Sequence, residues 1–188
     1  MGFAIARAAR EAGAQVTLVA GPVSLATPRG VTRIDVKSAR EMLEATMNEE
    51  PRADIFVATA AVADWRPVTQ SGEKIKKEGS GKAPVVAFTE NPDILLTVAQ
   101  GRRARGGDLY CVGFAAETHD LVAHAQAKLA RKGIPLIVGN IGPLTFGLED
   151  NQLLLVDRQG VRELPRASKI ALARQLVAEI ARRLPAGA

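Results

Sequence analysis

The residues best suited to chemistry lie in the stretch 55–77, IFVATAAVADWRPVTQSGEKIKK. The stretch begins with an apolar run, which is typical of a strand buried on both faces. Small residues and then Asp64 follow, and small side chains at the carboxyl end of a strand let a ligand approach the backbone. A polar loop then carries Lys74, Lys76 and Lys77. A strand end, a carboxylate and a lysine-rich loop together predict a site for a polyphosphate and a metal ion.

A second candidate segment, Asn91-Pro92-Asp93-Ile94, has the pattern of a helix start. We expect Asn91 to be the N-cap, Pro92 to occupy the first helical position and Asp93 to lie in the first turn. One interpretation is simply a well-capped helix. The other is an anion site, in which free N–H groups and the helix dipole face a phosphate and Asp93 holds a Mg²⁺ ion.

Lys128 and Lys132 are four residues apart, so they share one face near the end of a predicted helix. Lysines in a last turn stabilise a helix through its dipole by roughly 0.3–1 kcal/mol, which would explain both without a ligand. In the lysine loop, Lys76 and Lys77 could likewise be only part of a solvated charged surface. The alternative interpretation places these lysines at phosphate groups.

Composition excludes several classes of protein. The chain has 188 residues, of which 47% are hydrophobic, so we expect one folded domain over 1–188 rather than a disordered chain. No apolar run approaches the roughly 18 residues of a membrane span. The net charge of +5 comes from 25 basic and 20 acidic residues spread along the chain. Nucleic-acid binders concentrate basic residues on one face, so we expect no nucleic-acid partner. The single Cys111 lies in a strand-like run, so we expect a buried, inert thiol and a cytoplasmic location.

The hydrophobic patterns alternate between strand and helix, which predicts an α/β fold: a doubly wound, mostly parallel, Rossmann-like sheet with a C-terminal hairpin and helix. Helices are expected at 3–12, 39–48, 91–103, 119–132 and 168–184. Strands are expected at 15–20, 31–36, 54–60, 84–88, 109–114 and 135–139, with a hairpin formed by 151–157 and 161–164. Doubly wound domains normally open with a strand and a glycine-rich turn. This sequence opens on a helix, so we expect the first strand to be missing.

The ordered motifs GFAIA, VTLVAGPVSL, AAVADW, EKIKK, NPDIL, VGFAAET and NIG...FGLEDNQ resemble the phosphopantothenate-cysteine ligase family along essentially the whole chain. The resemblance implies a CTP-dependent ligase that forms a phosphopantothenoyl-cytidylate and pyrophosphate, after which cysteine displaces CMP. It also implies a homodimer and, in bacteria, a fused FMN-dependent decarboxylase, which this sequence does not contain. A loop that the family places before the equivalent of Met1 is absent too, so we expect low turnover.

The resemblance also assigns the nucleotide site to residues far apart in the chain. It implies that Lys74 is the catalytic lysine that neutralises the triphosphate and that Phe114 lines the base pocket. Asp93 would be the Mg²⁺ ligand as well as a CTP contact. The other implied CTP contacts are Ala60, Asp64, Asn91, Pro92, Ile94, Lys128 and Lys132. Such groups would offset negative charge when a carboxylate attacks an α-phosphate.

Two other functional classes are left open by the residues. An NAD(P)-dependent oxidoreductase would need a glycine fingerprint and a catalytic Tyr/Lys or His pair, and the only tyrosine, Tyr110, lies inside a predicted strand. A non-catalytic nucleotide-binding or interaction module would use the hairpin of residues 151–164 for dimerisation.

Overall fold

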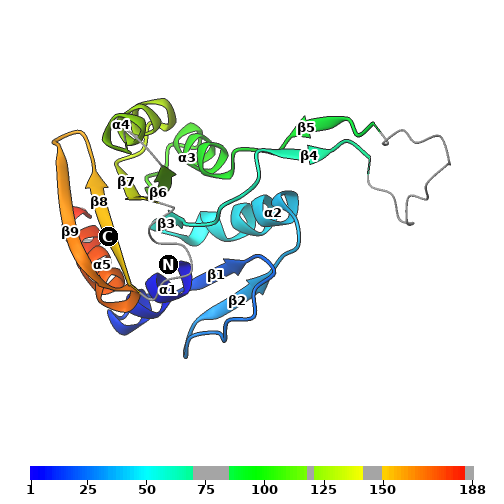
Figure 1. Ribbon diagram of the computed structural model, residues 1–188. Helices are drawn as coiled ribbons and strands as arrows, with labels where there is room; N and C mark the ends of the chain where they lie inside the picture. Colours follow the sequence, from blue (N-terminus) through cyan, green and yellow to red (C-terminus); the bar gives the residue numbers. More distant parts are fainter. Residues whose placement is uncertain (70–84, 118–120, 142–149, 185–188) are drawn as a thin grey trace.

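The computed structural model describes residues 1–69, 85–117, 121–141 and 150–184. Its centre is a five-stranded sheet with the strand order β3-β6-β7-β8-β9 (Figure 1). The first three of these strands are parallel, and the last two extend the sheet as an antiparallel hairpin. Their bounds are β3 (Ile55–Ala58), β6 (Tyr110–Glu117), β7 (Leu136–Ile141), β8 (Asp150–Val156) and β9 (Val161–Ser168). The parallel core with its C-terminal hairpin confirms the predicted fold class.

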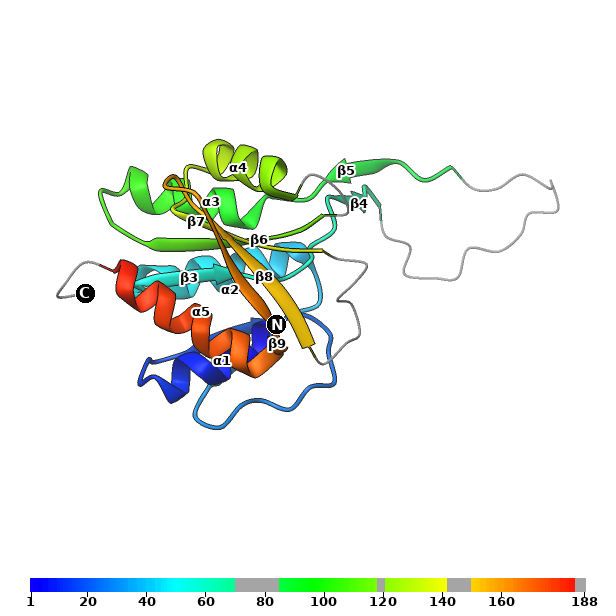
Figure 2. The ribbon, with the colours of Figure 1, turned by 60° about the vertical axis from the view of Figure 1, so that its left-hand side comes forward.

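Helices cover both faces of the central sheet. Successive side chains of its buried strands point to opposite faces, and they are apolar on both faces. On one face, Val112 and Val138 belong to a core formed with α1 and α5. On the other face, Cys111 and Ile137 belong to a core formed with α3 and α4. Figure 2 shows the sheet between these two helical layers. The helices are α1 (Gly2–Glu11), α2 (Ala39–Glu49), α3 (Ile94–Ala104), α4 (Leu121–Lys132) and α5 (Lys169–Arg183).

Two further strands, β1 (Thr17–Ala20) and β2 (Thr32–Asp35), form a separate parallel sheet, and α2 packs against β1 and α3. Within the described residues, no strand pairs with the second edge of β1 or of β3. The start of α1 lies against the chain that leaves β3. A Cβ atom on Gly2 would stand 2.7 Å from Thr59 Oγ1, so the absence of a side chain at Gly2 permits this close approach.

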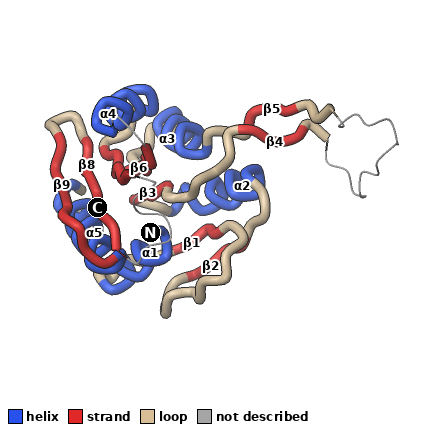
Figure 3. Tube along the Cα trace, viewed as in Figure 1, coloured by secondary structure: helices blue, strands red, loops and turns tan. Residues whose placement is uncertain are grey.

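A third, two-stranded sheet projects from the body as an antiparallel ribbon of β4 (Trp65–Pro67) and β5 (Phe88–Glu90) (Figures 1 and 3). The prediction of a strand at 84–88 is wrong, because the strand begins at Phe88, where it pairs with Pro67. The strand β4 was not predicted from the sequence. The ribbon and the residues next to it expose large apolar side chains, namely those of Trp65, Val68, Val85, Val86 and Phe88.

Local signals in the sequence place several other elements correctly. Ser38 caps α2, and its Oγ accepts a hydrogen bond from the N–H of Glu41 at 3.2 Å. Gly133 follows the last residue of α4 with a φ of 61°, a conformation that glycine adopts without strain. None of the described helices combines the length and the apolar character that crossing a membrane requires.

Candidate functional site

At the carboxyl edge of the sheet, β3 ends beside the middle of β6, since Ala58 pairs with Gly113 and β6 continues to Glu117. Ala60 and Asp64 follow β3 and are exposed. Phe114 follows Gly113, is half-buried, and packs against the core beneath α1 and α5. Ligands of open α/β sheets bind at this edge. The fold therefore brings three of the predicted contact residues to the expected edge of the sheet.

The start of α3 differs from its prediction. Asp93 is the N-cap residue, and its Oδ1 accepts a hydrogen bond from the N–H of Leu96 at 3.0 Å. Asn91 and Pro92 therefore precede the helix. The predictions that Asn91 caps α3, that Pro92 begins it and that Asp93 lies in its first turn are wrong. Ile94 is the first helical residue, and its side chain is buried.

Asn91 does not cap α3 because it is engaged elsewhere. Its Nδ2 donates to the carbonyl of Ala63 at 2.8 Å, and its backbone N–H donates to the carbonyl of Asp64 at 2.7 Å. Its Oδ1 accepts from Arg66 Nη1 at 3.3 Å. Asn91 thus ties the chain that leaves β3 to the chain that enters α3, at the base of the ribbon. The sequence analysis did not single out Arg66, and no local pattern marks it.

Lys132 connects α4 to the start of α3. Its Nζ lies 2.6 Å from Asp93 Oδ1 and 2.7 Å from Asp93 Oδ2. The side chain of Lys132 is 7% exposed, whereas that of Asp93 is 40% exposed. Side chains of a helix lean toward its N-terminus, so a lysine in the last turn of α4 can reach back along the helix.

Lys128 lies one turn earlier on the same face of α4. Its Nζ donates to the carbonyl oxygen of Phe114 at 3.1 Å. The two lysines therefore contact β6 at Phe114 and the start of α3 at Asp93. These contacts add to the dipole effect and place this face of α4 beside the start of α3.

Close packing holds α3 on β6 beside these contacts. A Cβ atom on Gly113 would stand 2.7 Å from Leu95 Cδ2 and 2.7 Å from Ile137 Cδ1. The glycine therefore allows the first turn of α3 to lie directly on the strand. This approach sets the position of Asp93 relative to Lys132.

The electrostatics of the site centre on Asp93. Burial alone would raise the pKa of its carboxyl, but the hydrogen bonds from Lys132 and from the Leu96 N–H outweigh it and hold the pKa below its usual value. The carboxylate is therefore ionised at neutral pH. Both of its oxygens already contact the Lys132 ammonium, and no three His, Cys, Asp or Glu residues of the described segments gather to hold a metal ion. The described residues do not form a ready Mg²⁺ site.

Two other predictions concern Lys74 and Cys111. Lys74 lies outside the described residues, as does the rest of the lysine loop up to position 84. Cys111 is buried, and burial raises the pKa of its thiol to about 11. The thiol is therefore protonated at neutral pH, and the prediction of a buried, inert cysteine is confirmed.

Residues 1–184 match the family described as the DNA/pantothenate metabolism flavoprotein C-terminal domain. The chain belongs to this family. A solved structure described as the C-terminal domain of the coenzyme A biosynthesis bifunctional protein CoaBC has a TM-score of 0.78 and 33% identity to this family member, and the match covers 97% of this chain and 81% of that one. The predicted resemblance is confirmed.

A relative from Vibrio cholerae, the coenzyme A biosynthesis bifunctional protein CoaBC, is 47% identical over 176 residues, which is 92% of this chain and 43% of that protein. The chain thus spans less than half the length of this curated relative. A mutant of Cab2 in complex with phosphopantothenate-cysteine has the same fold, with a TM-score of 0.64 and 16% identity over 82% of this chain and 53% of that one.

Proposed function

We propose that this chain joins 4′-phosphopantothenate to cysteine through an acyl-cytidylate intermediate made from CTP, as a ligase domain of coenzyme A biosynthesis. The observation that carries the proposal is the family match over residues 1–184, which aligns the chain with proteins named for coenzyme A biosynthesis. The geometry of the carboxyl edge supports it, because two lysines and a helix start lie where an anionic ligand would bind.

The chemistry requires charge neutralisation more than a nucleophilic side chain. A carboxylate oxygen of phosphopantothenate would attack the α-phosphorus of CTP, and the bond to pyrophosphate would break. The cysteine amine would then attack the acyl carbon, lose a proton and displace CMP. Both reactants of the first step are anions, so positioned cations lower its barrier. We assign this role to Lys74, Lys128 and Lys132, with Lys74 placed by the family resemblance alone.

The remaining contacts follow from the same edge of the sheet. Ala60 and Asp64, exposed after β3, would border the nucleotide, and Phe114 would line the base pocket. The segment 91–94 would face the phosphates with the first N–H groups of α3. A Mg²⁺ ion would supply charge neutralisation on the triphosphate, and such ions are commonly held largely by phosphate oxygens and water.

The proposal extends to partners. An isolated two-stranded ribbon is marginal in water, yet β4 and β5 expose Trp65 and Phe88, which are 57% and 59% exposed. We propose that a second copy of the chain covers these side chains in a homodimer. The Vibrio cholerae relative is named as bifunctional, and we propose that a decarboxylase accompanies this domain in the cytoplasm.

Isothermal titration with CTP and Mg²⁺ tests the proposed function. We expect saturable binding below millimolar concentration, and weaker binding of Lys74→Gln by about tenfold, the loss of one charge-assisted hydrogen bond. Titration of ATP under the same conditions tests the choice of nucleotide. Absence of CTP binding at millimolar concentration, or full affinity in Lys74→Gln, would count against the assignment.

A further inference from the structure

The pair of Asp93 and Lys132 has more contacts than a surface ion pair. The Lys132 ammonium touches both oxygens of Asp93, at 2.6 and 2.7 Å, and one of these oxygens also accepts from the Leu96 N–H at 3.0 Å. The two residues are 39 positions apart and lie on different helices. The carboxylate thus performs two tasks at once: it caps α3 and it anchors α4.

These contacts conflict with a Mg²⁺ ion bound directly to Asp93. Magnesium requires near-octahedral oxygen coordination at about 2.0–2.1 Å. A cation that close to Asp93 would have to displace the buried ammonium of Lys132, which carries the same sign of charge. An ammonium that loses its partner while it stays 7% exposed would be costly. Among the described residues, Asp93 also belongs to no group of three or more His, Cys, Asp or Glu side chains that could hold a metal ion.

Burial gives the pair a positional role. Ile94 and Leu95, the next residues after Asp93, are in the core, so the capped start of α3 is fixed on the sheet. The capping bond leaves the first two N–H groups of α3, those of Ile94 and Leu95, without an intrahelical partner. The bond to Asp93 places the Lys132 ammonium on the carboxylate that caps this first turn. One carboxylate therefore brings together two kinds of donor that an anionic ligand can use.

We propose that Asp93 is a positioning residue, which holds Lys132 at the first turn of α3 for the phosphates of the nucleotide, and that it does not bind the metal ion. This inference rests on the proposed function and assigns a different role to a residue of the same site. Asp93 acts through Lys132 and not on the reacting atoms.

A double-mutant cycle with Asp93→Asn and Lys132→Met tests the inference. Asparagine keeps an oxygen for the Leu96 N–H and remains a good N-cap, so the variant removes the charge and retains the cap. The first measurement is chemical denaturation without nucleotide. We expect Asp93→Asn to lower the denaturation midpoint of the wild type and to leave that of Lys132→Met unchanged. Glu44→Gln, at an exposed position of α2, is the control for the loss of one negative charge. Equal effects of Asp93→Asn in both backgrounds would overturn the pairing.

The second measurement is the affinity for CTP at fixed Mg²⁺, together with the affinity for Mn²⁺ of the CTP-bound protein followed by electron paramagnetic resonance. We expect each single variant to bind CTP about tenfold more weakly, and the double variant to be no weaker than the weaker single variant. The Mn²⁺ affinity should be unchanged in all three variants.

A loss of Mn²⁺ affinity on Asp93→Asn that persists in the Lys132→Met background would show that Asp93 is a metal ligand. CTP binding by the wild type would, in that case, leave the proposed function intact. A wild type that binds no CTP would overturn both.

Discussion

The amino and carboxyl ends of the parallel strands form two opposite edges of the central sheet, here called the amino edge and the carboxyl edge. These two edges hold their charged groups in different ways. At the amino edge, three arginines surround the carboxylate of Glu179, whose side chain is 8% exposed. At the carboxyl edge, Lys132 holds the carboxylate of Asp93, which is 40% exposed. One carboxylate is enclosed by the protein, and the other keeps part of its surface open to a ligand.

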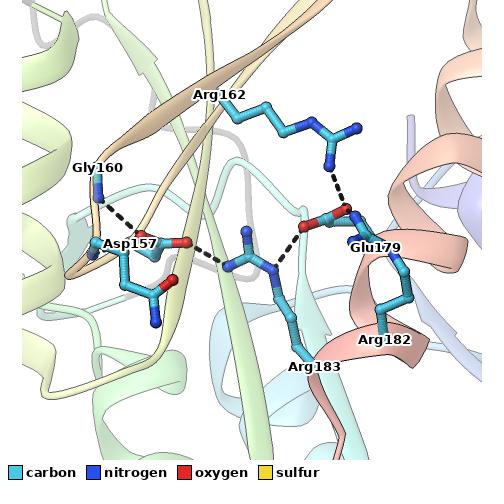
Figure 4. Close-up of polar contacts among 7 residues, drawn as sticks. Asp157, Gly160, Arg162, Glu179, Arg182 and Arg183 are labelled. Carbon is cyan, nitrogen blue, oxygen red and sulfur yellow. Dashed lines mark hydrogen bonds and ion pairs between the residues drawn. The ribbon is translucent and has the colours of Figure 1, made fainter.

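The amino edge contains a network that connects α5 to the β8–β9 hairpin (Figure 4). Arg183 bridges two carboxylates, at 2.9 Å from Glu179 and 2.6 Å from Asp157. Arg162 of β9 lies 2.7 Å from Glu179, and Arg182 contacts the same carboxylate. Asp157 also accepts from the backbone N–H of Gly160 at 3.0 Å, which closes the hairpin turn. These partners belong to the chain itself, so the network needs no ligand.

A second carboxylate at this edge is enclosed in the same manner. Glu50, with a side chain 1% exposed, lies 3.4 Å from Arg102 and also contacts Arg105. Arginine presents a rigid fork of donors and is suited to permanent, multidentate pairs, whereas lysine is a flexible point charge. Arginine clusters therefore stabilise the fold at the amino edge, whereas the proposed function assigns the lysines of the carboxyl edge to the ligand.

The largest expected effect is on stability, from Glu179→Gln. Loss of the charge leaves three arginines around a neutral group, and losing hydrogen bonds to a charged group costs about 1.5–3 kcal/mol. We expect the free energy of unfolding to fall by that amount while CTP affinity stays unchanged. Chemical denaturation and calorimetric titration measure the two quantities. Glu163→Gln, at an exposed position of β9, is the matched control. If the folded Glu179→Gln variant also lost CTP affinity, the claim that the amino edge is purely structural would be contradicted.

The next effect should be on binding, from Lys128→Met. The variant removes a charge from the carboxyl edge and leaves the Phe114 carbonyl without this donor. We expect CTP affinity to fall about tenfold, and the free energy of unfolding to fall by only about 1 kcal/mol. If stability fell and binding did not, Lys128 would be a structural residue like the arginines of the other edge.

The smallest effect concerns pH and Asp157. Burial by itself raises the pKa of Asp157, but hydrogen bonds from the Gln159 N–H and from Arg183 lower it below the usual value of 3.8. A lowered pKa in the folded state means that the stabilisation is complete above the unfolded-state value and is lost as pH falls through the folded-state value. The difference in unfolding free energy between wild type and Asp157→Asn should therefore shrink below about pH 4. A difference that grows toward acid would contradict this sign.

Much of the fold could be predicted because its signals are local. Ser38 with Glu41, and Gly133 after α4, each report a helix end within a few residues. The start of α3 could not be read in this way, because Asn91 and Asp93 are both good caps. Contacts of Asn91 with Ala63, 28 residues away, decide between them.

The candidate site, too, could be predicted only where its signals are local or come from the family resemblance. The family resemblance pointed to Lys128, Lys132 and Asp93. The sequence did not show that Lys132 and Asp93 form an ion pair, because the pair depends on how α3 and α4 pack together. The short ribbon strand β4 was also missed. Its register is set by β5, more than twenty positions further along the chain, and a three-residue strand that ends in proline has little periodicity of its own.

Nuclear magnetic resonance provides the most direct test of the division between the two edges. Backbone amide shifts would be recorded while Mg²⁺ and CTP are added to the wild-type chain. We expect the largest changes at residues 58–64, 91–97, 113–115 and 128–132, and little change at residues 50–52, 102–105, 157–162 and 179–183. Changes centred on the arginine clusters, with the carboxyl edge undisturbed, would contradict it.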